Sequence, residues 1–177
     1  FTVNANPGQW LTFDVRDVAD SGMTASGGTG SNDGGGALTD APIYYSLDGG
    51  LTWTPVGTTQ NLNYAITGLK KNAQYAIRLW VSSTGGESDK IEEYASTLPT
   101  APGEPENFNA VDITSSNMKV TWDAPTDNGG LNLTGYKVVY DKNSNFSNPT
   151  EVVLGLVNEL RVDGLTRGTT YYFNIYA

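Results

Sequence analysis

The fold is decided by the stretch MKVTWDAPTDNGGLNLTGYKVVY, residues 118–140. Apolar side chains occupy every second position of 118–122 and again of 136–140, which is the period of strands that bury one face. Residues 123–130 between them are rich in Asp, Asn, Pro and Gly, the residue types that form tight turns. The stretch therefore predicts two β-strands joined by a polar turn.

Two further segments of this half read as strands, 160–162 and 171–175. The last one points alternate side chains to a single face, and residues 75–81 show the same alternation earlier in the chain. The residues expected to face inward are Tyr171, Phe173, Ile175 and Ala177 in one segment and Tyr75, Ile77, Leu79 and Val81 in the other.

The chain also repeats itself. Without a gap, residues 7–46 align with 102–141 at an offset of 95, and eleven positions are identical, among them Phe13 with Phe108 and Tyr45 with Tyr140. After one inserted residue the offset becomes 96. A repeat of this length suits a seven-stranded sandwich.

This repeat predicts the domain organisation. We expect one domain over 7–98, a Pro-rich linker over 99–104 and a second domain over 105–177. Residues 1–6 align with 96–101, so we expect them to be the tail of a preceding module or its linker.

Several residues in the second copy resemble the consecutive landmarks of fibronectin type III modules. They are Trp122 with Pro125, the turn 128–130, the strand 136–140, and Leu165 six residues before Tyr171. The resemblance covers nearly the whole chain and implies an all-β fold of two tandem immunoglobulin-like sandwiches. It also implies a tyrosine corner, in which the Tyr171 phenol bonds to nearby backbone.

The first copy departs from this pattern. Gly27 aligns with Trp122, and Ala41-Pro42 replaces Tyr136-Lys137, so a large core ring and one backbone donor are absent. We expect a looser core there, or one repacked around Trp10 or Trp53.

The second copy lacks a counterpart of residues 90–98, which should form the last strand of the first copy. We expect the second domain to be truncated before that strand. The missing strand would then follow in the parent chain or come from another molecule by added strand pairing.

Composition excludes several function classes. The chain has no Cys and no His, which removes thiolate nucleophiles, imidazole bases and the usual zinc, haem and copper ligands. Its net charge of −9 opposes binding to nucleic acid and to anionic membranes. No apolar run is long enough for membrane insertion of this fragment. We expect no catalytic residue, no cofactor and no metal.

Two kinds of motif invite a functional interpretation. Residues 46–53, SLDGGLTW, match the Asp-box hairpin found in sialidases and related propellers, but one copy favours a hairpin over sugar chemistry. The acidic loops 31–36 and 123–130 and the carboxylates near the linker could offer oxygens to Ca²⁺. Solvated turns are the favoured interpretation of both loops. The carboxylates near the linker are Asp89, Glu92, Glu93, Glu104 and Glu106.

Tyr44 and Trp80 are the candidate binding residues, because the strand alternation points both away from the core. An exposed aromatic pair can stack on a sugar ring or anchor a protein partner. In the alternative interpretation, Arg78 or another long side chain covers the pair through a cation–π contact. Asn132 and Asn145 lie in N-x-S/T sequons and are the candidate N-glycosylation sites.

The leading hypothesis is a non-catalytic structural or adhesive spacer in an extracellular or cell-surface multidomain protein or filament. Its partners would be neighbouring modules of the same chain or other subunits of a surface assembly. The alternative is an accessory module that binds protein or carbohydrate, attached to a secreted polysaccharide-active enzyme or a receptor. An enzyme built on a carboxylate pair is the least favoured class, because the acidic residues fall in turns and at strand ends.

Overall fold

The computed structural model of the chain describes residues 12–28, 38–58, 63–84 and 86–177. The chain divides into two compact units, Phe1–Thr100 and Ala101–Ala177. Residues 1–6, Trp10 and the loop 31–36 lie outside the described residues. The part of the chain that is described contains no helix long and apolar enough to cross a lipid bilayer.

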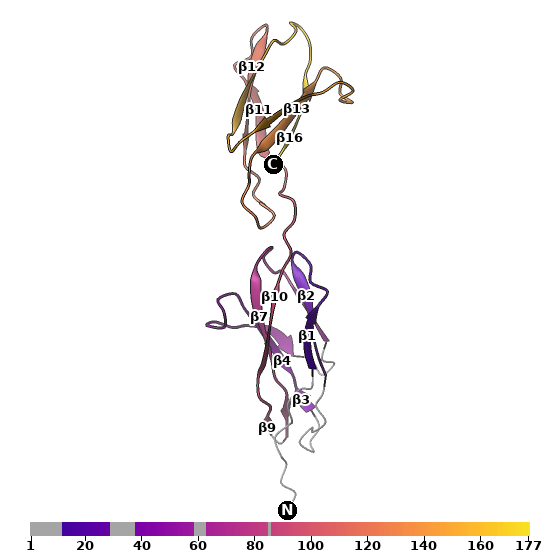
Figure 1. Ribbon diagram of the computed structural model, residues 1–177, viewed down its shortest axis with the longest axis vertical. Helices are drawn as coiled ribbons and strands as arrows, with labels where there is room; N and C mark the ends of the chain where they lie inside the picture. Colours follow the sequence, from indigo (N-terminus) through magenta and orange to yellow (C-terminus); the bar gives the residue numbers. More distant parts are fainter. Residues whose placement is uncertain (1–11, 29–37, 59–62, 85) are drawn as a thin grey trace, which may run out of the picture. The chain divides into compact units, whose positions relative to one another are not determined.

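The first unit contains two main antiparallel sheets and a small third one (Figure 1). One main sheet has the order β1-β2-β6, with strands Thr12–Arg16, Gly22–Gly28 and Asn63–Thr67. The other has the order β10-β7-β4-β5, with strands Ile91–Ser96, Gln74–Leu79, Pro42–Ser46 and Thr54–Thr58. The small sheet joins β3, β8 and β9, which are Leu38–Asp40, Ser82–Ser83 and Gly86–Glu87.

Both main sheets send buried side chains into one core. The buried members on strands are Met23 and Ala25 of β2, Ile66 of β6, Ile43 of β4, and Tyr75 and Ile77 of β7. Because each sheet covers the apolar face of the other, the unit is a two-layer sandwich.

The second unit repeats this plan with two antiparallel three-stranded sheets. The first has the order β11-β12-β15, with strands Glu106–Val111, Asn117–Asp123 and Glu159–Asp163. The second has the order β14-β13-β16, with strands Thr150–Leu154, Tyr136–Asp141 and Tyr172–Tyr176. The core unites Val120, Trp122, Tyr136, Val138 and Val162 from the two sheets. The all-β sandwich prediction is confirmed.

Each strand of the second unit has a counterpart in one of the two main sheets of the first unit, near the offsets found in the sequence. An offset of 95 carries the bounds of β2 onto those of β12, and an offset of 96 carries β6 onto β15. Even the backbone repeats, because Asp17 and Asp112 both adopt a φ of 51°. Residues other than glycine seldom take this left-handed conformation, so its recurrence indicates one shared fold.

A tyrosine corner closes each unit, as the resemblance implied. The Tyr75 hydroxyl accepts a hydrogen bond from the backbone N–H of Lys70 at 2.8 Å, and the Tyr171 hydroxyl accepts one from Thr166 at 3.0 Å. The hydrogen bond from the Thr166 backbone is the main cause that lowers the pKa of Tyr171 below its usual value. Each tyrosine thereby fastens the connection that crosses from one sheet to the other.

The expectation that Trp53 refills the first core is wrong. Trp53 is half-buried on the hairpin between β4 and β5, and it is absent from both core clusters of this unit. In the second unit Trp122 packs edge-on against Tyr136, with ring centroids 5.5 Å apart. Gly27, at the matching position of the first unit, pairs with Phe13, which packs against the core. Tyr45 and Tyr75 form an edge-on ring pair at 5.5 Å, and their counterparts Tyr140 and Tyr171 form a tilted pair at 6.4 Å in the second unit.

The tyrosine corners predict a stability loss in variants that lack the hydroxyl. Tyr75→Phe and Tyr171→Phe each remove a hydrogen-bond acceptor while keeping the ring, so each should cost about 1–2 kcal/mol of unfolding free energy. Urea unfolding of the two variants measures the loss. Tyr94→Phe is the control, because the Tyr94 side chain is 57% exposed. Equal stability of all three variants would contradict the role of the corners.

Candidate functional site

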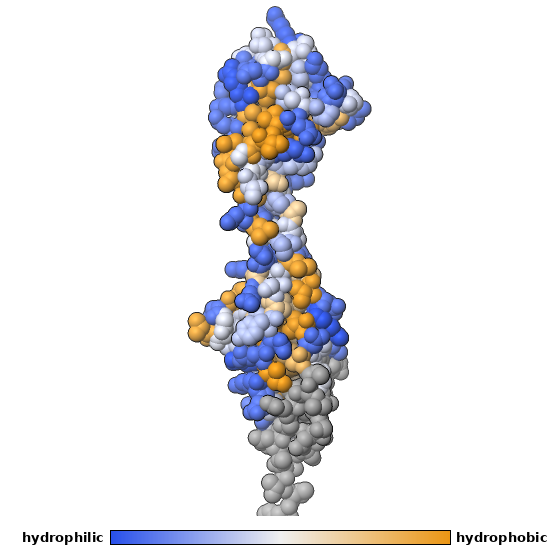
Figure 2. Space-filling model, viewed as in Figure 1, coloured by the Kyte–Doolittle hydropathy of each residue, from blue (hydrophilic) through white to orange (hydrophobic). Residues whose placement is uncertain are grey.

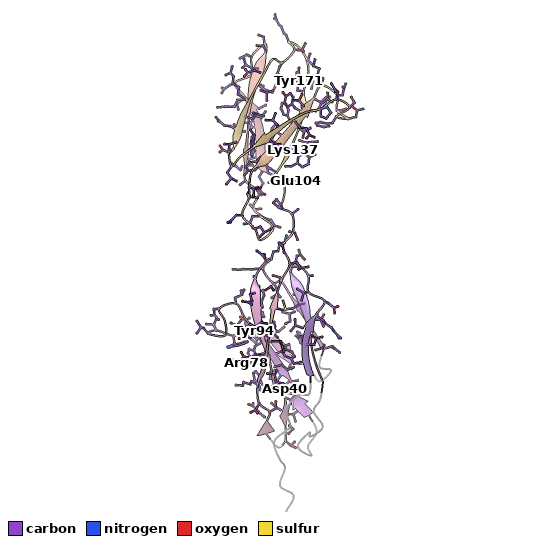
Figure 3. The ribbon with its side chains drawn as sticks, viewed as in Figure 1. Asp40, Arg78, Tyr94, Glu104, Lys137 and Tyr171 are labelled. Atoms are coloured by element: carbon purple, nitrogen blue, oxygen red, sulfur yellow. The ribbon has the colours of Figure 1, made fainter. Side chains whose placement is uncertain are left out.

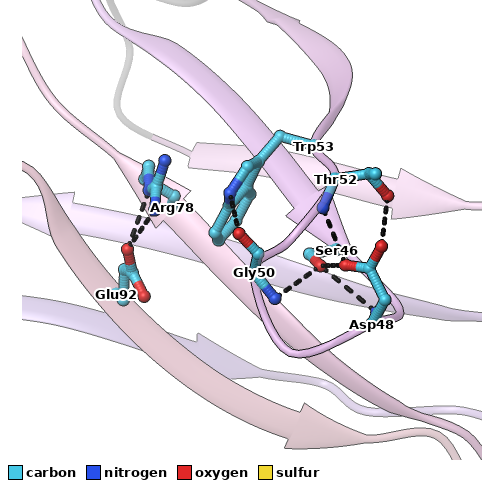
Figure 4. Close-up of polar contacts among 7 residues, drawn as sticks. All are labelled: Ser46, Asp48, Gly50, Thr52, Trp53, Arg78 and Glu92. Atoms are coloured by element: carbon cyan, nitrogen blue, oxygen red, sulfur yellow. Dashed lines mark hydrogen bonds and ion pairs between the residues drawn. The ribbon is translucent and has the colours of Figure 1, made fainter.

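The outer face of the sheet β10-β7-β4-β5 carries a row of interacting side chains. Strand register places Tyr44 beside Arg78 and Arg78 beside Glu92. Nε and Nη2 of Arg78 both donate to Oε1 of Glu92, at 2.8 and 2.5 Å (Figure 4). Figure 3 labels Arg78 on β7 and Tyr94 on the neighbouring β10, where Tyr94 pairs with Ala76.

Arg78 also lies against the indole of Trp53, which comes from the β4–β5 hairpin. Its guanidinium carbon is 3.8 Å from the ring centroid, the geometry of a cation–π contact. In the alternative interpretation Arg78 or another long side chain covers Tyr44 and Trp80, but Arg78 lies over Trp53 instead. The contact fixes the hairpin to the sheet through one side chain of the central strand β7.

The hairpin itself is organised by Asp48 (Figure 4). Ser46 Oγ donates to Asp48 Oδ1 at 2.6 Å, and Thr52 donates its backbone N–H to Oδ1 at 2.9 Å and its hydroxyl to Oδ2 at 2.5 Å. Gly50 donates its N–H to Ser46 Oγ and accepts the indole N–H of Trp53, each at 2.8 Å. The hydrogen bonds from Ser46 and Thr52 hold the pKa of Asp48 well below its usual range. The predicted Asp-box hairpin is therefore present and shapes the turn.

Tyr44 and Trp80, predicted from separate strands, do meet. Their rings stack with centroids 5.2 Å apart and an interplanar angle of 11°. Both side chains are half-buried rather than exposed, and the indole nitrogen of Trp80 is buried with no hydrogen-bond partner among the described residues. Nζ of Lys90 lies 4.9 Å from the Trp80 ring centroid, so a long side chain does cover this ring. These contacts occupy ring surface that a sugar would need, and the binding role of the pair stays a prediction.

A second candidate lies along β16 of the other unit. Among the described residues β16 pairs with β13 alone, whereas its counterpart β7 pairs with both β4 and β10. A hollow of about 330 Å³ follows this edge, lined by Glu104, Pro105, Phe108 and residues 173–176. Phe108 is 46% exposed, whereas Phe13 at the matching position packs against the cores beside β10.

Hydrophobic side chains remain on the surface of both units (Figure 2). Those of the second unit include Val153 and Leu156, which are 80% and 67% exposed. Tyr176 on β16 is capped by Lys137, whose Nζ lies 5.0 Å from the ring centroid. The outer sheet face of each unit therefore carries a cation over an aromatic ring.

The other predicted positions lie in loops. Asn132 and Asn145 are exposed, Asn132 between β12 and β13 and Asn145 between β13 and β14. Asp141 holds the second of these loops by accepting the backbone N–H groups of Asn143 and Asn148. Those two hydrogen bonds, the one from Asn148 first, lower the pKa of Asp141. Glycosylation at the two asparagines stays a prediction.

In the loop 123–130, Asp127 and Asn128 direct their side-chain oxygens to the backbone of the loop itself. Asp127 Oδ1 accepts the N–H of Gly129 at 2.9 Å, and Asn128 Oδ1 accepts that of Gly130 at 3.0 Å. Within the described residues, no three acidic side chains gather in a way that could hold a metal ion. Glu92, one of the carboxylates near the linker, is engaged by Arg78.

Sequence reasoning missed the contact between Arg78, Trp53 and Glu92. These residues come from three different parts of the chain and meet only once the strand register is known. The one available signal was the tryptophan that ends the Asp-box, since a hairpin tryptophan needs a neighbouring strand to cover it.

The repeated fold, the two corners and the sheet order agree with one family. A family model described as "Fibronectin type III domain" matches residues 103–177. This second unit is a fibronectin type III domain. The first unit shares its strand bounds and its tyrosine corner and is a fibronectin type III module of the same fold.

Relatives extend this similarity through both modules. Neogenin from Rattus norvegicus is 32% identical over 152 residues, 81% of this chain and 11% of that protein. Titin from Drosophila melanogaster is 25% identical over 171 residues, covering 92% of this chain and 1% of that protein. Fibronectin type III domain containing protein 3C1 from Mus musculus is 29% identical over 130 residues, 72% of this chain and 10% of that protein.

Each of these alignments is longer than either unit, so the similarity is to a tandem arrangement of modules. The chain spans about a tenth or less of the length of these relatives.

The hydrogen bonds of Asp48 predict a stability that depends on pH. The folded-state pKa of Asp48 is depressed, so its stabilising effect is present above the unfolded value of about 3.9 and lost as pH falls below it. Asp48→Asn should lower the melting temperature of the first module at neutral pH, and the difference from the native chain should shrink in acid. Thermal melts of both proteins across this range measure it. Asp14→Asn, on an exposed strand position, is the control.

The bare edge of β16 predicts that an added strand stabilises the second module. A copy of residues 82–98 appended after Ala177 would place the copied Ile91 opposite Ile175, by analogy with Ile91 and Leu79. We expect the melting temperature of this module to rise by about 5 °C or more. The control carries proline at the copied positions 93 and 95, which blocks strand pairing. An equal rise with both tails would exclude pairing as its cause.

Proposed function

We propose that the two modules are non-catalytic structural or adhesive spacers of an extracellular or cell-surface multidomain protein or filament. Residues 7–98 and 105–177 would be its modules, joined by the Pro-rich segment 99–104. Their partners would be neighbouring modules of the same chain or other subunits of a surface assembly.

One observation carries this proposal: two carboxylates with lowered pKa values and the two corner tyrosines use their oxygens to hold backbone. Asp48 and Asp141 have lowered pKa values because they accept hydrogen bonds from turns, and the tyrosine hydroxyls close the corners. A catalytic carboxylate or phenol needs a free position facing a substrate. In these modules the same groups hold the loops together, as expected of a structural spacer.

The relatives support the same interpretation. The chain aligns to a small part of much longer proteins, as expected of modules that recur along a chain. The exposed sequons at Asn132 and Asn145 fit an extracellular setting, because N-linked glycans are attached to exposed loops of secreted proteins.

Pulling the chain by its two termini tests the spacer role. We expect two separate unfolding events, one for each module, that release about 3.3–3.6 Å per unfolded residue. Trp122→Ala removes a core ring of the second module and should weaken one event while sparing the other. Extension without resistance would contradict the proposal. Surface labelling of intact cells that express the parent protein checks the location.

A further inference from the structure

The chain contains one Asn-Gly dipeptide, Asn128-Gly129, in the turn after β12. In such a pair the backbone nitrogen of the second residue can attack the side-chain carbonyl carbon of the asparagine and close a five-membered ring. Glycine permits this approach because it has no Cβ. Asn128 is exposed, so water reaches the site and can open the ring.

The loop places a base beside the attacking nitrogen. Asp127 Oδ1 accepts the N–H of Gly129 at 2.9 Å, within the 2.6–3.2 Å reach required of a general base. A carboxylate that already accepts a hydrogen bond from this N–H can take its proton as the nitrogen forms the new bond.

The loop also places a donor at the oxygen where negative charge develops. The N–H of Gly130 donates to Asn128 Oδ1 at 3.0 Å, which corresponds to the backbone donor of an oxyanion hole. Gly129 and Gly130 hold φ values of 71° and 84°, and this left-handed pair keeps both N–H groups in their positions.

We propose that this loop deamidates its own Asn128, with the Gly129 nitrogen as nucleophile and Asp127 as base. The bond from Gly129 N to Asn128 Cγ forms, and the bond from Cγ to Nδ2 breaks. The proton taken by Asp127 leaves with Nδ2 as ammonia. Water then opens the succinimide at either carbonyl, giving aspartate or isoaspartate at position 128.

Asp48-Gly49 in the first module is a related dipeptide, but its surroundings oppose ring closure. Both carboxylate oxygens of Asp48 accept hydrogen bonds from Ser46 and Thr52, which hold its pKa well below the usual range. Ring closure at an aspartate needs the neutral acid, so Asp48 is protected. The same chain therefore contains an internal reference that should stay unmodified.

The modification would change the start of the second module. The carbonyl oxygen of Asp127 accepts the N–H of Gly103 at 2.8 Å, which fastens the first residues of this domain to the loop. Isoaspartate inserts an extra methylene into the main chain beside this contact, and both products add a negative charge. The fraction of chains modified at position 128 therefore increases with the age of the protein.

Peptide mass spectrometry of the full chain, incubated at neutral pH, tests the proposal. The rate of amide-to-acid conversion at Asn128 is compared with the rate in urea, where the contacts of the loop are lost. Asp127→Ser keeps a hydroxyl to accept the N–H of Gly129 but removes the carboxylate. We expect it to slow conversion roughly tenfold, less than the about 10²-fold of an enzymatic base, because the loop is open to water.

Asp123→Ser is the matched control, since Asp123 is a carboxylate at the other end of the loop that accepts from Asn107. Faster conversion in the folded chain than in urea, slowed by Asp127→Ser alone, supports the proposal. Conversion that is no faster in the folded chain, or that both variants slow equally, overturns it. The melting temperature of each variant shows that the module remains folded.

Discussion

In both modules, a tyrosine hydroxyl accepts a hydrogen bond from the connection that crosses between the two sheets. Each sheet has an apolar face that must be covered, and only a correctly placed crossover sets one sheet over the other. The glycines before the corners, Gly68 and Gly164, have φ values of 71° and 74° and let the chain turn there. The backbone N–H of Leu69 donates a hydrogen bond to the carbonyl of Ser21, and that of Leu165 donates to the carbonyl of Ser116. These bonds tie the same connection to the residues directly before β2 and β12.

Much of the fold could be predicted because its signals are local or periodic. Alternation predicted the inward faces of 75–81 and 171–177, and the repeat offsets predicted matching strands in the two halves. The packing around Gly27, where the second module has Trp122, could not be predicted in this way. Gly27 pairs with Phe13, which packs against the core, whereas Trp53 covers Arg78, and both contacts depend on strand register.

The surface was predicted less well, because its contacts join residues far apart in sequence. Alternation predicted that Tyr44 and Trp80 point away from the core, and their rings stack, although both side chains are half-buried rather than exposed. It did not show that Lys90 covers Trp80 while Arg78 turns to Trp53, since several long side chains compete for the same rings. The hydrogen bonds of Asp48 were easier to anticipate, because all of its partners lie within four residues along the chain.

The contact between Arg78 and Trp53 determines how the hairpin at 46–53 responds to high salt. Dissolved ions screen the attraction between exposed charges, so the Arg78–Glu92 pair weakens as ionic strength rises. The contact with the indole, at 3.8 Å from the guanidinium carbon to the ring centroid, leaves no room for intervening ions and also gains from dispersion. The hairpin should therefore stay packed on its sheet in concentrated electrolyte, after the Arg78–Glu92 ion pair has lost most of its strength.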